Sequence, residues 1–237
     1  MELQLSLESM LRPRGRGGKR LGAGRKRTRT TVAHTARESF SPRDPIHSTL
    51  RLVPGVQLRT PALLAIVHAV IARSHGADFR IVEFNCEPNH MHVMAEASGR
   101  VALARGMQRF KSVLARRINQ ALGRRGALFA DRYHAHVLRS LREVRHALRY
   151  ILNNARHHAA ERGRALDPRW FDPFSSVAWF DGWTAPLAPY SSWTYELMRR
   201  HAPTARATVW VLTTGWRRHG LIDPAEVPGP ARRKPRG

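Results

Sequence analysis

The sequence predicts an α+β domain whose elements follow in the order β-α-β-β-α-β-α. Three observations carry this prediction: short segments in which apolar and polar residues alternate, longer segments in which apolar residues recur every three or four positions, and Pro and Gly residues between them. The first six elements have the order of the ferredoxin-like, split βαβ arrangement. In that arrangement the third strand is central, and we expect the final helix to lie against the open face of the sheet.

Four segments have the short length and the alternation of strands. The first is rich in β-branched residues and stops at Pro54 and Gly55, which favour a turn. The second and third are joined by a short connection, residues 85–89, and are expected to form a hairpin. The predicted strands are residues 46–53, 79–83, 90–96 and 131–138.

Three segments have helical spacing and recognisable start signals. Thr60 and Pro61 suit the N-cap and first position of a helix that ends near Gly76. Ser140 and Glu143 have the spacing of a capping box at the start of the last helix. The predicted helices are residues 60–75, 101–122 and 140–158.

The charge of the chain indicates a polyanionic partner. The 237 residues include 41 Lys and Arg but only 17 Asp and Glu, which gives a net charge of +24. Cations that neutralise phosphates release condensed counterions, so nucleic acid is the expected partner. Nearly all these cations are Arg, whose planar guanidinium group can form two hydrogen bonds to one phosphate, which Lys cannot do in the same way. An Arg excess can also reflect genome composition. No apolar stretch approaches the length of a membrane span, so we expect no membrane partner.

A flexible basic arm is expected before the folded domain. Residues 12–29 contain no acidic side chain and are rich in Gly and Arg, so they cannot bury a core. Pro13 to Arg16 resembles an AT-hook, which enters a narrow minor groove, and the alternative is a solvated tail that adds only nonspecific charge. The residues predicted to contact nucleic acid, in the arm and in the domain, are Arg14, Arg16, Lys19, Arg20, Arg25, Lys26, Arg27, Arg109, Lys111, Arg116 and Arg132.

We divide the chain into the arm, residues 1–44, a catalytic domain, residues 45–160, and an irregular C-terminal extension, residues 161–237. Thr208 to Thr213 is a possible strand within the extension. The extension is rich in Trp and Phe, which could stack on bases but more often pin such a segment onto the core. Cys86 is the single cysteine, and no secretory signal is evident, so a cytoplasmic, nucleoid-associated protein is expected.

Two short motifs carry the candidate chemistry. His90 and His92 alternate with apolar residues, so both imidazoles should lie on one face of a strand. Tyr150 and Asn154 are four residues apart and should share one face of the final helix. Two imidazoles and a carboxamide could hold Mg²⁺ or Mn²⁺ beside the phenol. This combination suits metal-assisted cleavage of a phosphodiester through a phosphotyrosine link.

These motifs resemble those of a known family. Residues 88–93, Pro-Asn-His-Met-His-Val, are similar to the His-hydrophobe-His motif of the HUH single-tyrosine transposases, an insertion-sequence transposase family. Residues 131–139 followed by 148–151 resemble the REP-associated tyrosine transposase branch, and the resemblance covers roughly residues 45–158. It implies an HUH endonuclease domain that cuts single-stranded DNA at a hairpin and stays attached through a 5′-phosphotyrosine.

The resemblance also assigns residue roles. His90 and His92 match the metal ligands of the family, Tyr150 matches the nucleophile, and Asn154 matches a third ligand. The chain departs from the family pattern at Leu152, where a His is usual, and at residues 155–156, where Pro-Val is usual. Neither departure deletes a catalytic group, but Leu152 removes a polar neighbour of the tyrosine.

Several alternatives stay open at this point. The chain could be a catalytically silent, domesticated DNA-binding protein of the same fold, and a replication initiator is a weaker third reading because it would carry a further domain. His134 and His136 have the same spacing as the first pair, and we interpret them as DNA-facing or structural. Glu83, Glu87 and Glu96 are carboxylates close to the site in sequence. Members of the family act as monomers or as homodimers, and the sequence does not distinguish them.

Overall fold

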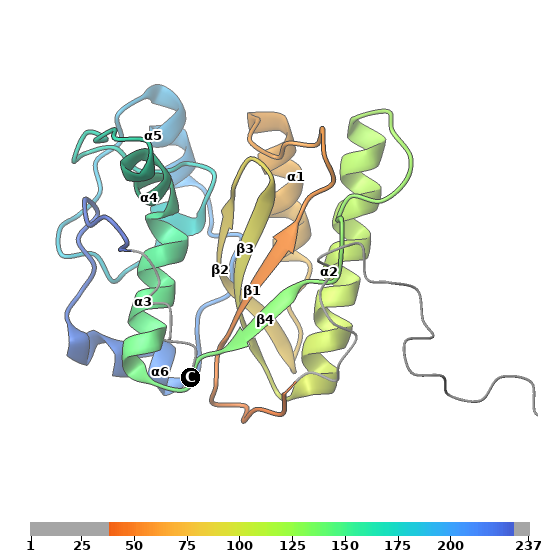
Figure 1. Cartoon of the computed structure of the whole chain (residues 1–237), viewed down its shortest axis with the longest axis horizontal. Helices are drawn as coiled ribbons and strands as arrows, with labels where there is room; N and C mark the ends of the chain where they lie inside the picture. The colour runs from red at the N-terminus through yellow and green to blue at the C-terminus, as the bar shows by residue number, and fades with distance from the viewer. Residues whose placement is uncertain (1–37, 230–237) are drawn as a thin grey trace, which may run out of the picture. The chain divides into compact units, whose positions relative to one another are not determined.

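The computed structural model describes residues 38–229, which contain one four-stranded antiparallel sheet (Figure 1). The strand order is β2-β3-β1-β4, with β3 and β1 in the centre. This is the order of the ferredoxin-like arrangement, so the predicted fold class is confirmed. The strands are β1 Ile46–Arg51, β2 Phe79–Cys86, β3 His90–Ala97 and β4 His134–Val137.

The predicted helix starts are confirmed by their hydrogen bonds. The Thr60 hydroxyl accepts from the backbone N–H of Leu63 at the start of α1, and Ser140 and Glu143 form a reciprocal capping box at the start of α3. Each cap satisfies N–H groups that have no partner within the helix. The helices are α1 Pro61–Ala72, α2 Arg100–Ala121, α3 Leu141–Leu152, α4 Asn154–Glu161, α5 Ser192–Arg199 and α6 Trp210–Thr213, with short 3₁₀ turns η2 Ser176–Trp179 and η3 Gly215–His219.

Alternate residues of the central strands face two different layers. Met91 and Val93 point to the apolar core made with α1 and α2, whereas Met94 joins a second core made with α3. Figure 1 shows the sheet between α3 on one side and α1 and α2 on the other. Because side chains alternate across a strand, the histidines of β3 lie on the α3 side. The expected contact between the open face of the sheet and the last helix is therefore confirmed.

The final helix differs from the prediction, because it is interrupted at Asn153. This residue has φ −105° and ψ 20°, ends α3 and precedes α4, which runs to Glu161 instead of His158. The Asn153 amide donates to the backbone carbonyls of Asp223 and Glu226, so a C-terminal segment, residues 220–229, is attached at the junction.

The C-terminal region completes the second core. Trp216 is fully buried and packs in one cluster with α3 residues such as Leu148. This favours the structural interpretation of the aromatic residues. The possible strand at residues 208–213 is wrong: residues 210–213 form α6. The reason is that the Glu96 carboxylate accepts from the N–H groups of Thr208 and Val209, which fixes the start of this helix.

The described residues before β1 also pack on the domain. Phe40 contacts the first core, and Glu38 forms an ion pair with Arg139. The arm residues before residue 38 lie outside the described part of the chain. No helix within residues 38–229 is long and apolar enough to cross a membrane.

Candidate active site

The two histidines of β3 converge on one point. His90 Nε2 lies 2.9 Å from His92 Nε2, and the ring centroids are 4.6 Å apart. Two nitrogens bound to one metal ion at about 2.1 Å each would be about 3 Å apart at a right angle. The sheet therefore places this pair at the spacing of two ligands of one cation.

His92 is held in place by two side chains of β1. His47 Nε2 lies 3.0 Å from His92 Nδ1, and the Thr49 hydroxyl lies 3.3 Å from the same nitrogen. Antiparallel pairing sets Thr49 directly opposite His92, which brings these groups together. Because His92 Nδ1 is engaged here, His92 Nε2 is the nitrogen turned toward His90 and available to a ligand.

Burial keeps these imidazoles neutral. Desolvation lowers the pKa of His90 to about 4, with a further contribution from His158 and Arg51. Desolvation also lowers the pKa of His47 to about 4 and that of His92 well below its ordinary value. Neutral imidazoles keep a lone pair, so they can bind a cation at neutral pH.

Tyr150 lies beside the histidines on α3. Its ring centroid is 5.2 Å from that of His92 and 6.2 Å from that of His47. Burial raises the pKa of the phenol above its ordinary value of 10, so Tyr150 is protonated at neutral pH. The hydroxyl therefore needs a proton acceptor before it can act as a nucleophile.

A cavity of about 620 Å³ opens between these groups. Tyr150, His90 and His92 share its wall with two cations, Arg51 and Arg162. Guanidinium groups bind phosphate oxygens, so the cavity suits a phosphodiester. The complete lining comprises Thr49, Arg51, Pro88, Asn89, His90, His92, Tyr150, His158 and Arg162.

Asn154 is placed differently from the other predicted ligands. Its side chain is fully buried and is not part of the cavity lining. Among the described residues, its Oδ1 and Nδ2 form no hydrogen bond of good geometry, but the carboxamide lies close enough to the Tyr150 hydroxyl to oppose the rise in the pKa of that phenol. A buried carboxamide without a hydrogen bond of good geometry is costly, and it leaves a carbonyl oxygen available to a cation.

The predicted nucleic-acid contacts divide into an arm group, which the structure does not describe, and four domain residues, which do not line the cavity. The seven arm residues, from Arg14 to Arg27, lie outside the described residues. Arg109 and Arg116 are exposed on α2, which packs on the face of the sheet opposite to Tyr150. Lys111 and Arg132 line a separate hollow of about 410 Å³ beside Tyr133.

The acidic residues near the site in sequence have other positions. Glu96 caps α6, and Glu83 accepts a hydrogen bond from the Ser176 hydroxyl, while burial raises its pKa to about 8. Glu87 is buried, and desolvation raises its pKa. None of the three lines the cavity that holds Tyr150.

The second histidine pair lies on the edge strand β4. His134 and His136 are exposed, and His136 lines a hollow of about 550 Å³ on another side of Tyr150 together with His47. Within residues 38–229, the only group of three His, Cys, Asp or Glu with ligand atoms close together involves neither histidine of this pair. Their exposure agrees with a DNA-facing or structural role.

Sequence reasoning missed the residues that complete the site. They are His47, Thr49 and Arg51 on β1, and His158 and Arg162 near the end of α4. The β1 residues alternate with buried ones, and β1 is adjacent to β3 in the predicted fold. The alternation within β1 could have indicated His47, Thr49 and Arg51, because alternate residues of neighbouring strands lie on the same face of a sheet.

The fold and the site together define a class of protein: a ferredoxin-like domain with paired histidines and a tyrosine on the facing helix. Residues 60–154, from the N-cap of α1 to the first residue of α4, match the family described as "Transposase IS200 like". This part of the chain is therefore similar to the IS200-like transposases.

Two further comparisons concern solved structures and curated sequences. A solved structure described as a REP-associated tyrosine transposase bound to a REP hairpin aligns with a TM-score of 0.49 and 16% sequence identity. The alignment covers 75% of this chain and 99% of that chain. A comparison with curated protein sequences finds no match.

Proposed function

We propose that the protein cleaves and rejoins single-stranded DNA through a 5′-phosphotyrosine intermediate, as a transposase or as an enzyme that processes REP-type palindromes. One observation carries this proposal: Tyr150 lies in one cavity with the converging Nε2 atoms of His90 and His92. The similarity of residues 60–154 to a transposase family supports the same chemistry.

The residues that would bind a divalent cation are His90, His92 and Asn154. The 2.9 Å separation of the two Nε2 atoms and the buried carboxamide of Asn154 next to Tyr150 both fit such a ligand set. Mg²⁺ or Mn²⁺ bound there would polarise the scissile phosphate. The side chains of Arg51 and Arg162 would hold the phosphodiester against the cavity wall.

In the cleavage step the Tyr150 oxygen attacks phosphorus and loses its proton. The bond between phosphorus and the 3′ oxygen breaks, and that oxygen leaves as a hydroxyl after taking up a proton. The product is a 5′-phosphotyrosine and a free 3′ end. Rejoining reverses these steps, because one phosphoester replaces another and no external energy source is required.

The nucleic-acid contacts belong to the same proposal. We assign single-stranded or hairpin DNA to the cavity, and we assign additional phosphate contacts to the arm cations and to the α2 residues Arg109 and Arg116. The protein acts on this DNA as a monomer or as a homodimer.

The decisive experiment is a search for a covalent protein–DNA adduct. The full chain is incubated with a pool of hairpin oligonucleotides and Mn²⁺, and denaturing gels then detect the adduct. We expect an adduct that is abolished in Tyr150→Phe and strongly reduced in His90→Ala. Tyr195→Phe, which changes an exposed tyrosine on α5, is the matched control and should retain the adduct.

A second candidate is a DNA-binding protein that no longer cuts. The position of Asn154 favours it, because this side chain is buried away from the cavity lining. Tight hairpin binding without any adduct, unchanged in Tyr150→Phe, would support the second candidate and exclude the first. An adduct that persists in Tyr150→Phe would show that Tyr150 is not the nucleophile.

A further inference from the structure

A second cluster of ligand-type side chains lies on α4, beside the candidate active site. The ligand atoms of His157, His158 and Glu161 all lie within 4.8 Å of one another. His157 Nε2 is 3.3 Å from one carboxylate oxygen of Glu161, and His158 Nδ1 is 2.8 Å from the other. Within residues 38–229, no other three residues of these types meet in this way.

The orientation of His157 is fixed from outside the helix. Its Nδ1 lies 2.9 Å from the carbonyl oxygen of Pro228, so Nδ1 carries the hydrogen and donates to this acceptor. In the neutral ring Nε2 then has a lone pair, and this lone pair faces the Glu161 carboxylate. Two acceptors that face each other need a cation between them, either a proton or a metal ion.

The bond to Pro228 is also the arrangement found around metal-binding histidines. A histidine ligand usually donates its second ring nitrogen to a carbonyl or carboxylate, which fixes the ring and raises its basicity. The C-terminal segment provides this carbonyl from 71 residues away along the chain. The cluster is thus supported by tertiary structure and is more than a coincidence of helical spacing.

We propose that His157 Nε2, His158 Nδ1 and the Glu161 carboxylate bind one divalent transition-metal ion. Two imidazole nitrogens and one carboxylate suit Zn²⁺, Co²⁺ or Ni²⁺ better than Mg²⁺, which prefers oxygen ligands. This site shares no ligand with the pair His90 and His92. It therefore does not depend on the function proposed above.

An ion at this site would lie close to the cavity in which the DNA substrate is proposed to bind. The His157 ring centroid is 5.8 Å from that of Tyr150, and His158 is part of the wall of the Tyr150 cavity. Three protein ligands leave at least one tetrahedral position open to water or to a phosphate oxygen. An ion at this place adds positive charge to the side of the cavity formed by α4.

Metal binding tests the proposal without any measurement of DNA cleavage. The full chain without an affinity tag is stripped with EDTA and titrated with Zn²⁺ by calorimetry, and Co²⁺ absorption reports the ligand environment. The double variant His90→Ala/His92→Ala removes the candidate active-site pair. We expect this variant to bind one Zn²⁺ per chain.

Substitutions within the cluster identify the ligands. In the His90→Ala/His92→Ala background, Glu161→Gln and His157→Ala should each weaken Zn²⁺ binding by at least tenfold, since even loss of a residue that only supports a ligand costs about 10- to 100-fold. His146→Ala removes an exposed imidazole on the neighbouring helix α3 and should leave affinity unchanged. Circular dichroism in EDTA verifies that each variant is folded.

Two results would overturn the proposal. The first is a folded His90→Ala/His92→Ala variant that binds no Zn²⁺, which would indicate a single site. The second is Zn²⁺ binding that is unaffected by both Glu161→Gln and His157→Ala. The adduct assay reports on Tyr150 and not on Zn²⁺ stoichiometry, so failure of the proposed function and failure of this site give different results.

Discussion

His47 connects the two strands that build the candidate metal site. It is half-buried on β1, and its Nε2 lies 3.0 Å from His92 Nδ1. Desolvation lowers its pKa to about 4, so at neutral pH this ring is uncharged and can accept the His92 Nδ1 hydrogen. His47 is therefore a positioning residue: it fixes the tautomer of His92, a candidate ligand, and does not itself line the cavity that His90 and His92 share with Tyr150.

We expect His47→Leu to weaken Mn²⁺ binding about 10- to 100-fold, the range for residues that support a metal ligand. His47→Gln should restore part of the affinity, because its amide oxygen can still accept from His92. Titration of metal into the purified variants measures both effects. His136→Ala, an exposed neighbour that pairs with His47 across the sheet, is the control and should bind normally.

Equal affinities for Mn²⁺ in wild type, His47→Leu and His47→Gln would show that the orientation of the His92 ring does not depend on His47. In that case Thr49, which also reaches His92 Nδ1, would suffice to orient the ring.

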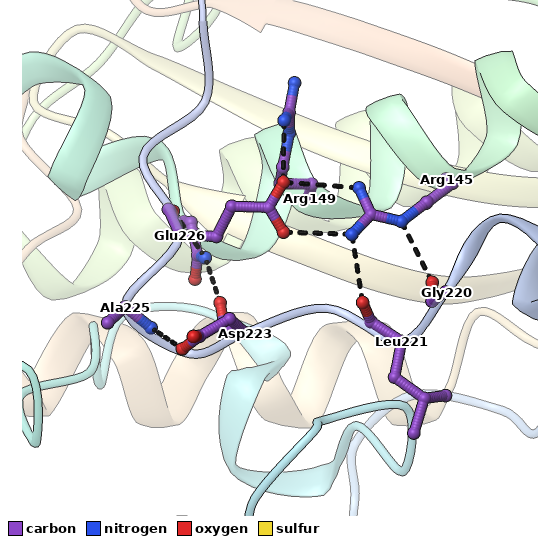
Figure 2. A network of polar contacts seen from close by, with 8 residues as sticks. Arg145, Arg149, Gly220, Leu221, Asp223, Ala225 and Glu226 are labelled. Carbon is purple, nitrogen blue, oxygen red and sulfur yellow. Dashed lines mark hydrogen bonds and ion pairs between the residues drawn. The ribbon is translucent and has the colours of Figure 1, made fainter.

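At the scale of elements, the junction between α3 and α4 depends on the C-terminal segment. Glu226 forms ion pairs with Arg145 and Arg149 of α3, and Arg145 also donates to the carbonyls of Gly220 and Leu221 (Figure 2). These contacts surround the turn of α3 that carries Tyr150. The segment therefore stabilises the helix end that carries Tyr150, the candidate nucleophile.

We expect Glu226→Gln to lower the free energy of unfolding at neutral pH by about 1 kcal/mol, a modest value because solvent screens the pairs. Burial alone would raise the pKa of Glu226, but hydrogen bonds from Arg145 and Arg149 outweigh it, so the pKa is lowered below 4.5. A lowered pKa stabilises the folded state above pH 4.5, and this contribution is lost as the pH falls through the folded-state value. Thermal melts at several pH values measure this difference.

The difference between wild type and Glu226→Gln should accordingly shrink in acid. Glu196→Gln, at an exposed position of α5, is the control and should show a far smaller effect at neutral pH. A Glu226→Gln difference that stays constant from pH 7 to pH 3 would contradict the assignment to these ion pairs.

For the molecule as a whole, the net charge of +24 favours binding to a polyanion such as the proposed DNA substrate. Residues 12–29 contribute nine Lys and Arg side chains and no acid. Residues 38–44 are different, because Phe40 packs on the core and Glu38 pairs with Arg139. A deletion that tests the arm should therefore stop at residue 37.

We expect deletion of residues 1–37 to weaken hairpin binding and to flatten its dependence on salt. Each arm cation that contacts phosphate should reduce the slope of log K against log[salt] by about 0.7 to 0.9. Fluorescence anisotropy at several salt concentrations measures the slope, with the Tyr150→Phe full-length chain as a control for cleavage. An unchanged slope would show that the arm does not touch the DNA.

The order of elements and the shared face of His90 and His92 were predictable from the sequence. Alternation placed His90 and His92 on one face of a strand, and Thr60 and Ser140 marked helix starts, because these signals are local. The length of the last helix was not predictable. Its break at Asn153 depends on carbonyl groups of Asp223 and Glu226, some 70 residues away.

The sequence by itself determined the fold class, the charge and the paired histidines, since periodicity and composition act over a few neighbouring residues. Tertiary structure alone decided which side chains surround that pair. The register of the sheet places His47 beside His92, and the direction of α4 after the break places His158 in the cavity wall. Contacts between distant segments form only when burial of apolar surface fixes the elements against one another, and no local pattern encodes that packing.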